Sequence, residues 1–129
     1  MNLKVNYLSK DNLHILYRGH QFELYEIVDN GRKLVSDFIE TLAESEQKKM
    51  LALLKRSADH GLPQNIEKFR HIRDGLYEFK TFGVRLFCFL QKGKMIIITH
   101  GALKKRQKGD ADTYEKAFRL MKECGIERK

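Results

Sequence analysis

The spacing of apolar residues changes along the chain, and the changes divide it into segments of different type. Residues 22–29 alternate partly between apolar and polar positions and end in an Asn-Gly pair suited to a tight turn, which predicts a strand. The apolar positions that follow recur at i, i+3, i+4 and i+7, and this spacing predicts a helix over 33–44. A second helix, for which Ser45 is the expected cap, ends at Gly61. We expect the two helices to form a hairpin.

Three segments of strand type occupy the middle of the chain, at residues 76–82, 84–91 and 94–100. The last two are joined by a Lys-Gly pair, a two-residue loop of the kind that closes antiparallel hairpins, so we expect a meander. The segment 84–91 is apolar on both of its alternating faces, which predicts a central strand. The basic, interrupted segment 65–75 gives no clear pattern of either type.

The two ends of the chain carry the remaining signals. A last helix is expected to begin at Asp112, which forms a capping-box pattern with Glu115, and to end at Gly125. Residues 1–18 contain two short apolar stretches that fit a hairpin, and we expect them to be an N-terminal extension. The order of elements predicts an α+β fold, an antiparallel sheet packed by an N-terminal helical hairpin and followed by a C-terminal helix.

The composition fits one soluble domain. The 129 residues, 42% hydrophobic and 33% charged, lie near the commonest domain size and composition, so we expect residues 1–129 to form a single domain. Two cysteines are too few for a disulfide framework, and no apolar run is long enough to span a bilayer. We therefore expect a cytoplasmic protein with no membrane partner. No motif of metal-ligand or cofactor-binding spacing is present, so we expect neither a metal nor a cofactor.

Positive charge is the feature that points to function. The net charge of +8 favours partners that carry phosphate or acidic side chains. Because neighbouring strands of a meander run in opposite directions, Lys80 near the end of one strand and Arg85 near the start of the next share an edge of the sheet. His100 ends the third strand at that edge, and a basic segment follows it. Four pieces of sequence therefore bring cations to one end of the sheet, which favours a phosphate site.

Each of these residues also has a simpler explanation. A lysine at a strand end is most often solvated or ion-paired, and Glu78 is an available partner for Lys80. The basic segment fits a solvated loop, and a lone histidine such as His100 is most often packed. Arg85 differs, because a guanidinium flanked by apolar residues is costly near a core without an anion or a carboxylate. It is the strongest single candidate.

Residues 75–121 resemble the C-terminal half of the HigB-like toxins of the RelE/ParE superfamily, in their phage-derived branch. The resemblance is carried by the Leu-Tyr-Glu-Phe-Lys motif at 76–80, by Arg85, by the His100-Gly101 pair and by the paired Lys104 and Lys105. The preceding strand and two helices are similar in order and spacing, so the resemblance covers residues 22–123. The chain departs from the family where Lys80 stands for the usual Arg and Val84 for the usual Tyr.

The resemblance implies a RelE-like fold and the toxin of a type II toxin-antitoxin system. Such a toxin is a ribosome-dependent mRNA endoribonuclease, neutralised by a cognate antitoxin that we expect to be a helix-turn-helix protein. Its reaction is attack of a ribose 2′-OH on the adjacent phosphate, without a metal. The catalytic residues that the resemblance implies are Arg85 on the scissile phosphate, Lys104 and Lys105 on phosphate and ribosomal RNA, Lys80 as supporting charge, and His100 in proton transfer. The RNA-binding residues are then Lys68, Arg70, Arg73, Arg106 and Lys108.

Other functions stay open at this point. Lysine cannot make the planar, bidentate contact of arginine, so the change at Lys80 puts catalysis in question. The general base is undetermined, because the pKa of an isolated lysine is too high unless burial or neighbouring cations lower it. A gyrase poison of the ParE type shares the fold and acts by binding a protein. A phage protein that binds RNA or an acidic partner without cutting it also fits the charge.

Overall fold

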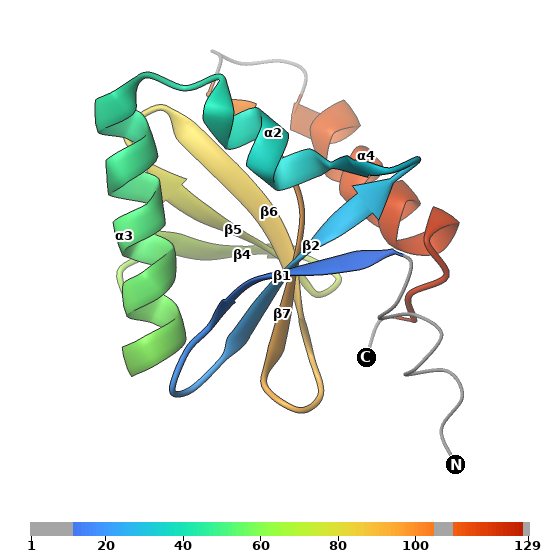
Figure 1. The fold of residues 1–129 in the computed structure, drawn as a ribbon, viewed down its shortest axis with the longest axis horizontal. Coiled ribbons are helices and arrows are strands. Elements are labelled where there is room, and N and C mark those ends of the chain that lie inside the picture. The colour runs from blue at the N-terminus through green and yellow to red at the C-terminus, as the bar shows by residue number, and fades with distance from the viewer. Residues whose placement is uncertain (1–11, 105–109, 128–129) are drawn as a thin grey trace.

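A mixed sheet runs through the chain in the computed structural model, which describes residues 12–104 and 110–127 (Figure 1). Within these residues the strands are β1 (Leu13–Arg18), β2 (Glu23–Asp29), β3 (Arg32–Lys33), β4 (Phe69–Arg73), β5 (Leu76–Thr81), β6 (Val84–Gln91) and β7 (Met95–Leu103). The helices are α2 (Leu34–Glu40), α3 (Glu44–His60) and α4 (Asp110–Glu123). The sheet has the order β1-β2-β7-β6-β5-β4, and the short β3 pairs with β2. The predicted α+β class is confirmed.

The predicted meander is present and is longer than expected. Strands β4 to β7 pair in sequence, each antiparallel to the next, and β6 is central with β5 and β7 beside it. The sheet is not antiparallel throughout, because β2 runs parallel to β7. The two helices and the rest of the meander lie between these strands in the chain, which is the long connection that a parallel pair needs.

The structure adds to or differs from the predicted strands in three details. The segment 65–75 contains β4, an edge strand whose exposed arginines and histidine hide the usual alternation. The stretch 13–18 forms β1 and pairs with β2, and the apolar stretch before it, the other half of the expected hairpin, lies outside the described residues. The connection between β6 and β7 has three residues instead of two, with Gly93 and Lys94 both at positive φ.

The helices also begin and end at other residues than predicted. The first helix covers only 34–40, and the Thr41 hydroxyl donates to the Phe38 carbonyl at its end. Helix α3 begins one residue before Ser45, and it is Glu46 that accepts a hydrogen bond from the Ala43 N–H, at 3.2 Å. Helix α4 begins two residues before Asp112, and Glu115 pairs with Arg73 rather than capping the helix.

Helices cover both faces of the sheet and divide the core in two. On one face α2 and α3 pack over side chains that include Phe79 and Leu86. On the other face α4 packs over Phe87 and Phe89. Strand β6 contributes alternately to both clusters, which explains why its sequence is apolar on both faces. Arg85 is on the same face of β6 as Phe87 and Phe89, so the charged side chain of this strand lies on the face covered by α4.

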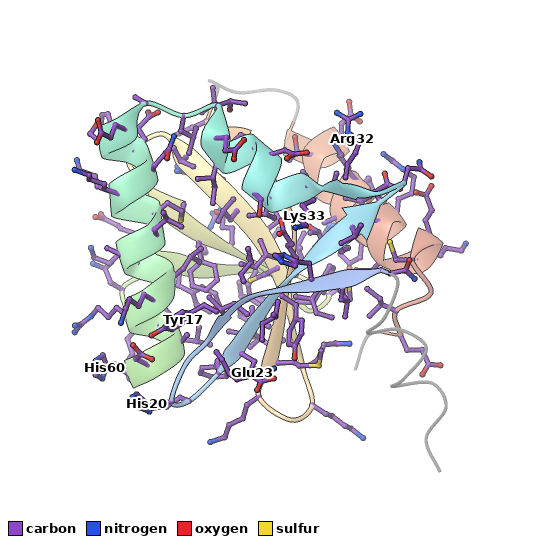
Figure 2. All side chains as sticks on the ribbon, in the orientation of Figure 1. Tyr17, His20, Glu23, Arg32, Lys33 and His60 are labelled. Carbon is purple, nitrogen blue, oxygen red and sulfur yellow. The ribbon has the colours of Figure 1, made fainter. Side chains whose placement is uncertain are left out.

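The β1–β2 hairpin is fastened to the C-terminal end of α3, where Figure 2 labels Tyr17, His20 and His60. The Tyr17 hydroxyl donates to Asp59 Oδ2 at 2.8 Å, and the His20 N–H donates to Asp59 Oδ1 at 3.2 Å. Gly19 approaches the helix so closely that a Cβ there would lie 2.5 Å from the Ala58 backbone. The hairpin and α3 therefore hold a fixed position relative to each other.

A buried carboxylate fixes the start of α2. Glu26, on β2, accepts hydrogen bonds from the Ser36 N–H at 2.7 Å and from the Ser36 hydroxyl at 2.6 Å. His14 Nδ1 lies 2.7 Å from the same side chain. Because backbone N–H groups in the first turn of a helix lack partners within the helix, the carboxylate satisfies one of them and joins α2 to the sheet.

Gly101 is required for the packing of α2 on β7. A Cβ at Gly101 would lie 2.3 Å from Phe38 Cδ2 and 2.8 Å from Leu86 Cδ2. We expect Gly101→Ala to lower the free energy of unfolding by about 1–3 kcal/mol, because the strand and the helix must move apart, and urea denaturation measures this change. Adding Phe38→Leu removes the ring that the new Cβ meets and should recover part of the loss. An unchanged midpoint for Gly101→Ala would contradict the prediction.

Candidate phosphate-binding site

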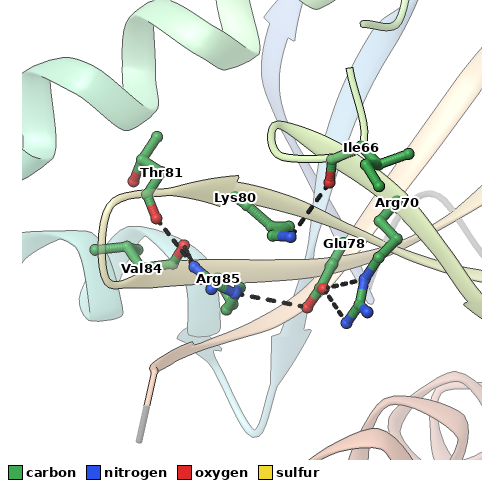
Figure 3. A network of polar contacts seen from close by, with 7 residues as sticks. All are labelled: Ile66, Arg70, Glu78, Lys80, Thr81, Val84 and Arg85. Atoms are coloured by element: carbon green, nitrogen blue, oxygen red, sulfur yellow. Dashed lines mark hydrogen bonds and ion pairs between the residues drawn. The ribbon is translucent and has the colours of Figure 1, made fainter. Parts of the chain in front are cut away.

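A buried carboxylate organises the positive charge on the face of α4 (Figure 3). Glu78, on β5, has a side chain only 2% exposed and lies between Arg70 of β4 and Arg85 of β6. Arg70 Nε donates to Glu78 Oε2 at 2.8 Å, and Arg70 Nη2 lies 2.6 Å from the same oxygen. Arg85 Nε lies 3.9 Å from Glu78 Oε1. Two guanidinium groups thus share one carboxylate, so the cluster has a net positive charge.

Arg85 is held in place at the start of β6. Its Nη1 donates to the Thr81 and Val84 carbonyls, each at 3.0 Å, and its side chain is 15% exposed. Glu78 is the carboxylate partner that the sequence predicted an arginine at this position would need. A guanidinium carries five N–H donors in a rigid fork, more than these contacts use. The geometry therefore presents a preorganised group for a phosphate.

Lys80 lies directly opposite Arg85 across the β5–β6 pair, at the edge of the sheet that the two residues were predicted to share. Its Nζ donates to the Ile66 carbonyl at 3.2 Å, whereas the Glu78 carboxylate, the partner considered from the sequence, is engaged by arginines. Burial lowers the pKa of Lys80, and the charges of Arg70 and Arg85 lower it further against the opposing effect of Glu78. Burial and neighbouring cations are the two conditions under which a lysine becomes a usable general base.

A groove of about 1100 Å³ opens beside Lys80 and Arg85. Its walls come from α3, from the segment that precedes β4, and from the β5–β6 turn. Its cationic lining residues are Lys49, Arg56, Lys68, Lys80, Arg85 and Lys104, and Glu67 is the single carboxylate of the lining in the part of the chain described. A concave surface with this excess of one charge attracts a polyanion.

The groove lies within a recognised family domain. The model of the phage-derived Gp49-like protein family matches residues 37–122 of the 129. The chain belongs to this family. The Gp49-like family is part of the RelE/ParE-like toxin superfamily, as the resemblance of the sequence predicted. No curated protein matches the chain significantly. The matched range of this Gp49-like protein contains α3 and the whole meander, and hence every cation named in the lining of the groove.

The structure brings together some of the predicted site residues of the Gp49-like domain. Lys68, Lys80, Arg85 and Lys104 all line the groove, and Arg70 joins them through Glu78. Three further predicted residues, Lys105, Arg106 and Lys108, lie outside the described residues.

Arg73 is separate from the groove. It lies at the end of β4 where the strand meets Leu76 of β5, whereas Lys80 is at the other end of β5. Its guanidinium pairs with Asp74 and Glu115 and lies 4.8 Å from the centre of the Phe118 ring. These contacts give Arg73 a structural role in holding α4 against the meander.

His100 is buried beneath α4 and does not line the groove. Its ring is stacked on Phe87 with 4.9 Å between ring centres, and Nδ1 lies 3.0 Å from Thr99 Oγ1. Burial, and then the positive charges of Lys116 and Arg119, lower the pKa of His100 to about 4, although the Thr113 backbone favours the charged form. The histidine is therefore neutral near pH 7, and the geometry favours a packing role over proton transfer.

Two parts of the groove do not follow from the sequence patterns considered above. Lys49 and Arg56 line it from α3, with Ala52 between them at the i, i+3, i+7 spacing of one helix face. Phe82, in the β5–β6 turn, also lines it and is 90% exposed. The signals for both are in the sequence, as a basic helix face and as a large aromatic residue beside a turn glycine.

The described residues contain neither a helix that could span a membrane nor a cluster that could bind a metal. None of the helices in this part of the chain is long and apolar enough to cross a bilayer. Nor do three or more His, Cys, Asp or Glu side chains gather there in a way that could hold a metal ion.

Proposed function

We propose that this protein is the toxin of a type II toxin-antitoxin system, a HigB-like endoribonuclease that cuts mRNA on the ribosome. The observation that carries the proposal is the cross-strand pair of Lys80 and Arg85 in a groove lined by cations. Membership of the RelE/ParE-like toxin superfamily supports it. In the proposal a cognate antitoxin, expected to be a helix-turn-helix protein, binds the toxin and keeps it inactive in the cytoplasm.

The proposed reaction is attack of a ribose 2′-OH on the adjacent phosphate. Lys80, in its neutral form, takes the proton of the 2′-OH, which the lowered pKa of Lys80 supports. The oxygen forms a bond to phosphorus and the bond to the 5′ oxygen breaks, giving a 2′,3′-cyclic phosphate and a 5′-OH end. Arg85 stabilises the charge that grows on the phosphoryl oxygens. Lys104, in the same groove, supplies a cation that can protonate the leaving 5′ oxygen.

Mapping mRNA ends tests the proposed function. Purified protein is added to a cell-free translation reaction, and the 5′ ends of the mRNA are mapped with and without translating ribosomes. We expect new 5′-OH ends only in the translated message. If the protein also cuts mRNA in the absence of ribosomes, the proposed dependence on ribosomes is wrong.

If the mRNA stays intact in the translation reaction although the protein is correctly folded, the proposed nuclease activity is wrong. A gyrase supercoiling assay would then test the alternative of a ParE-like poison. Circular dichroism of the same preparation shows whether the protein is folded.

A further inference from the structure

We propose that the groove holds a single-stranded RNA segment along α3, with Phe82 as the platform on which one nucleobase stacks. This inference rests on the proposed function for the identity of the substrate, and it adds the path of the RNA and a base contact. Phe82 would be a binding residue, since its ring has no part in the transfer of protons or charge.

The position of Phe82 is the first observation. Its ring is 90% exposed, so it contributes almost nothing to the core, whereas the other phenylalanines of the meander are buried. It follows Lys80 by two residues and precedes Arg85 by three, and all three residues line the same groove. A base stacked on Phe82 would therefore lie beside the phosphate that Lys80 and Arg85 are proposed to handle.

The wall formed by α3 is the second observation. Lys49 and Arg56 line the groove from this helix. Because seven residues of an α-helix span about 10 Å, the two cations are too far apart to serve a single phosphate. They mark a track along the helix, in the same groove that Arg85 lines from β6 and Lys68 lines from the segment before β4.

The combination of groups identifies the ligand class. Cations alone would fit any polyanion, including an acidic protein segment. An exposed aromatic ring among cations matches single-stranded nucleic acid, whose unpaired bases offer a π-face and whose backbone carries a charge at every step. A duplex would keep its bases stacked inside and leave the Phe82 ring without a partner.

The test measures binding of a short, fluorescently labelled single-stranded RNA to the purified protein, without ribosomes, by anisotropy. Phe82→Leu should weaken binding about tenfold, because stacking is lost, and Phe82→Tyr should bind as the wild type does. The side chain is exposed, so thermal unfolding of both variants should match the wild type. Equal affinity of Phe82→Leu and the wild type would overturn the stacking platform.

The cations are tested through the salt dependence of the same binding. Lys49→Gln and Arg56→Gln should each reduce the slope of log K against log salt by about 0.7, the value for one lost phosphate contact on a single strand. Lys92→Gln is the matched control, since Lys92 lies in the β6–β7 turn at the opposite end of β6 from Arg85. A slope that changes equally in all three variants would overturn the path along α3.

The failure of this inference and the failure of the proposed function give different results. If the protein cuts translated mRNA and Phe82→Leu binds and cuts as well as the wild type, the nuclease stands and the platform is wrong. If no cleavage occurs but RNA binding depends on Phe82, the platform stands and the nuclease is wrong. Tighter binding of a labelled poly-glutamate peptide than of the RNA would overturn the assignment of the ligand class.

Discussion

Replacing Arg85 with alanine should lower the rate of mRNA cleavage roughly 100- to 1000-fold, the loss typical when one preorganised donor to a transition state is removed. The guanidinium is fixed by the Thr81 and Val84 carbonyls and by Glu78, so in the proposed reaction it would meet the phosphate without having to reorganise. Single-turnover cleavage of a translated message, with the protein in excess over ribosomes, measures the rate.

Two variants control this measurement. Arg85→Lys keeps the positive charge but loses the planar, bidentate hydrogen bonding of the guanidinium, so its cleavage rate should lie between those of Arg85→Ala and the wild type. Arg32→Ala removes an exposed arginine of β3, labelled in Figure 2 and distant in the chain from the meander, and should leave the rate unchanged. Glu78 keeps its contact with Arg70 in the Arg85 variants, so their thermal unfolding should stay close to that of the wild type. A folded Arg85→Ala variant that cuts mRNA at the normal rate would refute the assigned role.

Between about pH 7 and about pH 4, the unfolding free energy of the wild type should fall by about 3 kcal/mol more than that of a His100→Phe variant. The pKa of His100 is about 4 in the folded protein and ordinarily 6.5. Between these values the unfolded chain binds more protons than the folded one, so the stability falls as the pH falls. Phenylalanine removes the titrating group and keeps a ring that can stack on Phe87.

This prediction concerns the difference between the wild type and His100→Phe in unfolding free energy at each pH, not the curve of either protein alone. The two proteins differ only at residue 100, so subtracting one curve from the other leaves the contribution of His100. Urea denaturation at a series of pH values gives the two curves. Curves that stay parallel down to pH 4 would show that His100 does not control the acid response.

The sequence patterns predicted the elements whose partners are close in the chain. The meander follows from short loops and alternation, and it correctly placed Lys80 and Arg85 at the same edge of the sheet. The double-sided apolar pattern of 84–91 identified the central strand, because a strand buried on both faces has no polar side to show. Local patterns of this kind depend only on neighbouring residues.

What the patterns missed depends on contacts between distant segments. The parallel pairing of β2 with β7 leaves no signal in either strand. Edge strand β4 is basic and shows no clear alternation, so the sequence patterns did not identify it. Because Arg70 lies on β4, its ion pair with Glu78 could not be predicted either. The burial of His100 depends on where α4 packs. The shape of the groove likewise depends on how α3 lies against the β5–β6 turn, which no local pattern shows.

The parallel pairing of β2 with β7 also sets the order in which the protein can be completed during synthesis. Strand β7 lies between β2 and β6, so it joins the N-terminal hairpin to strands β4 to β6, and Glu23 finds its partner only at Met95. Pairing across so long a stretch of chain has a large entropic cost and slows folding. Until β7 has left the ribosome, the hairpin and strands β4 to β6 have no strand between them. The sheet is therefore completed only after β7 emerges, although the β1–β2 hairpin and strands β4 to β6 are made before it.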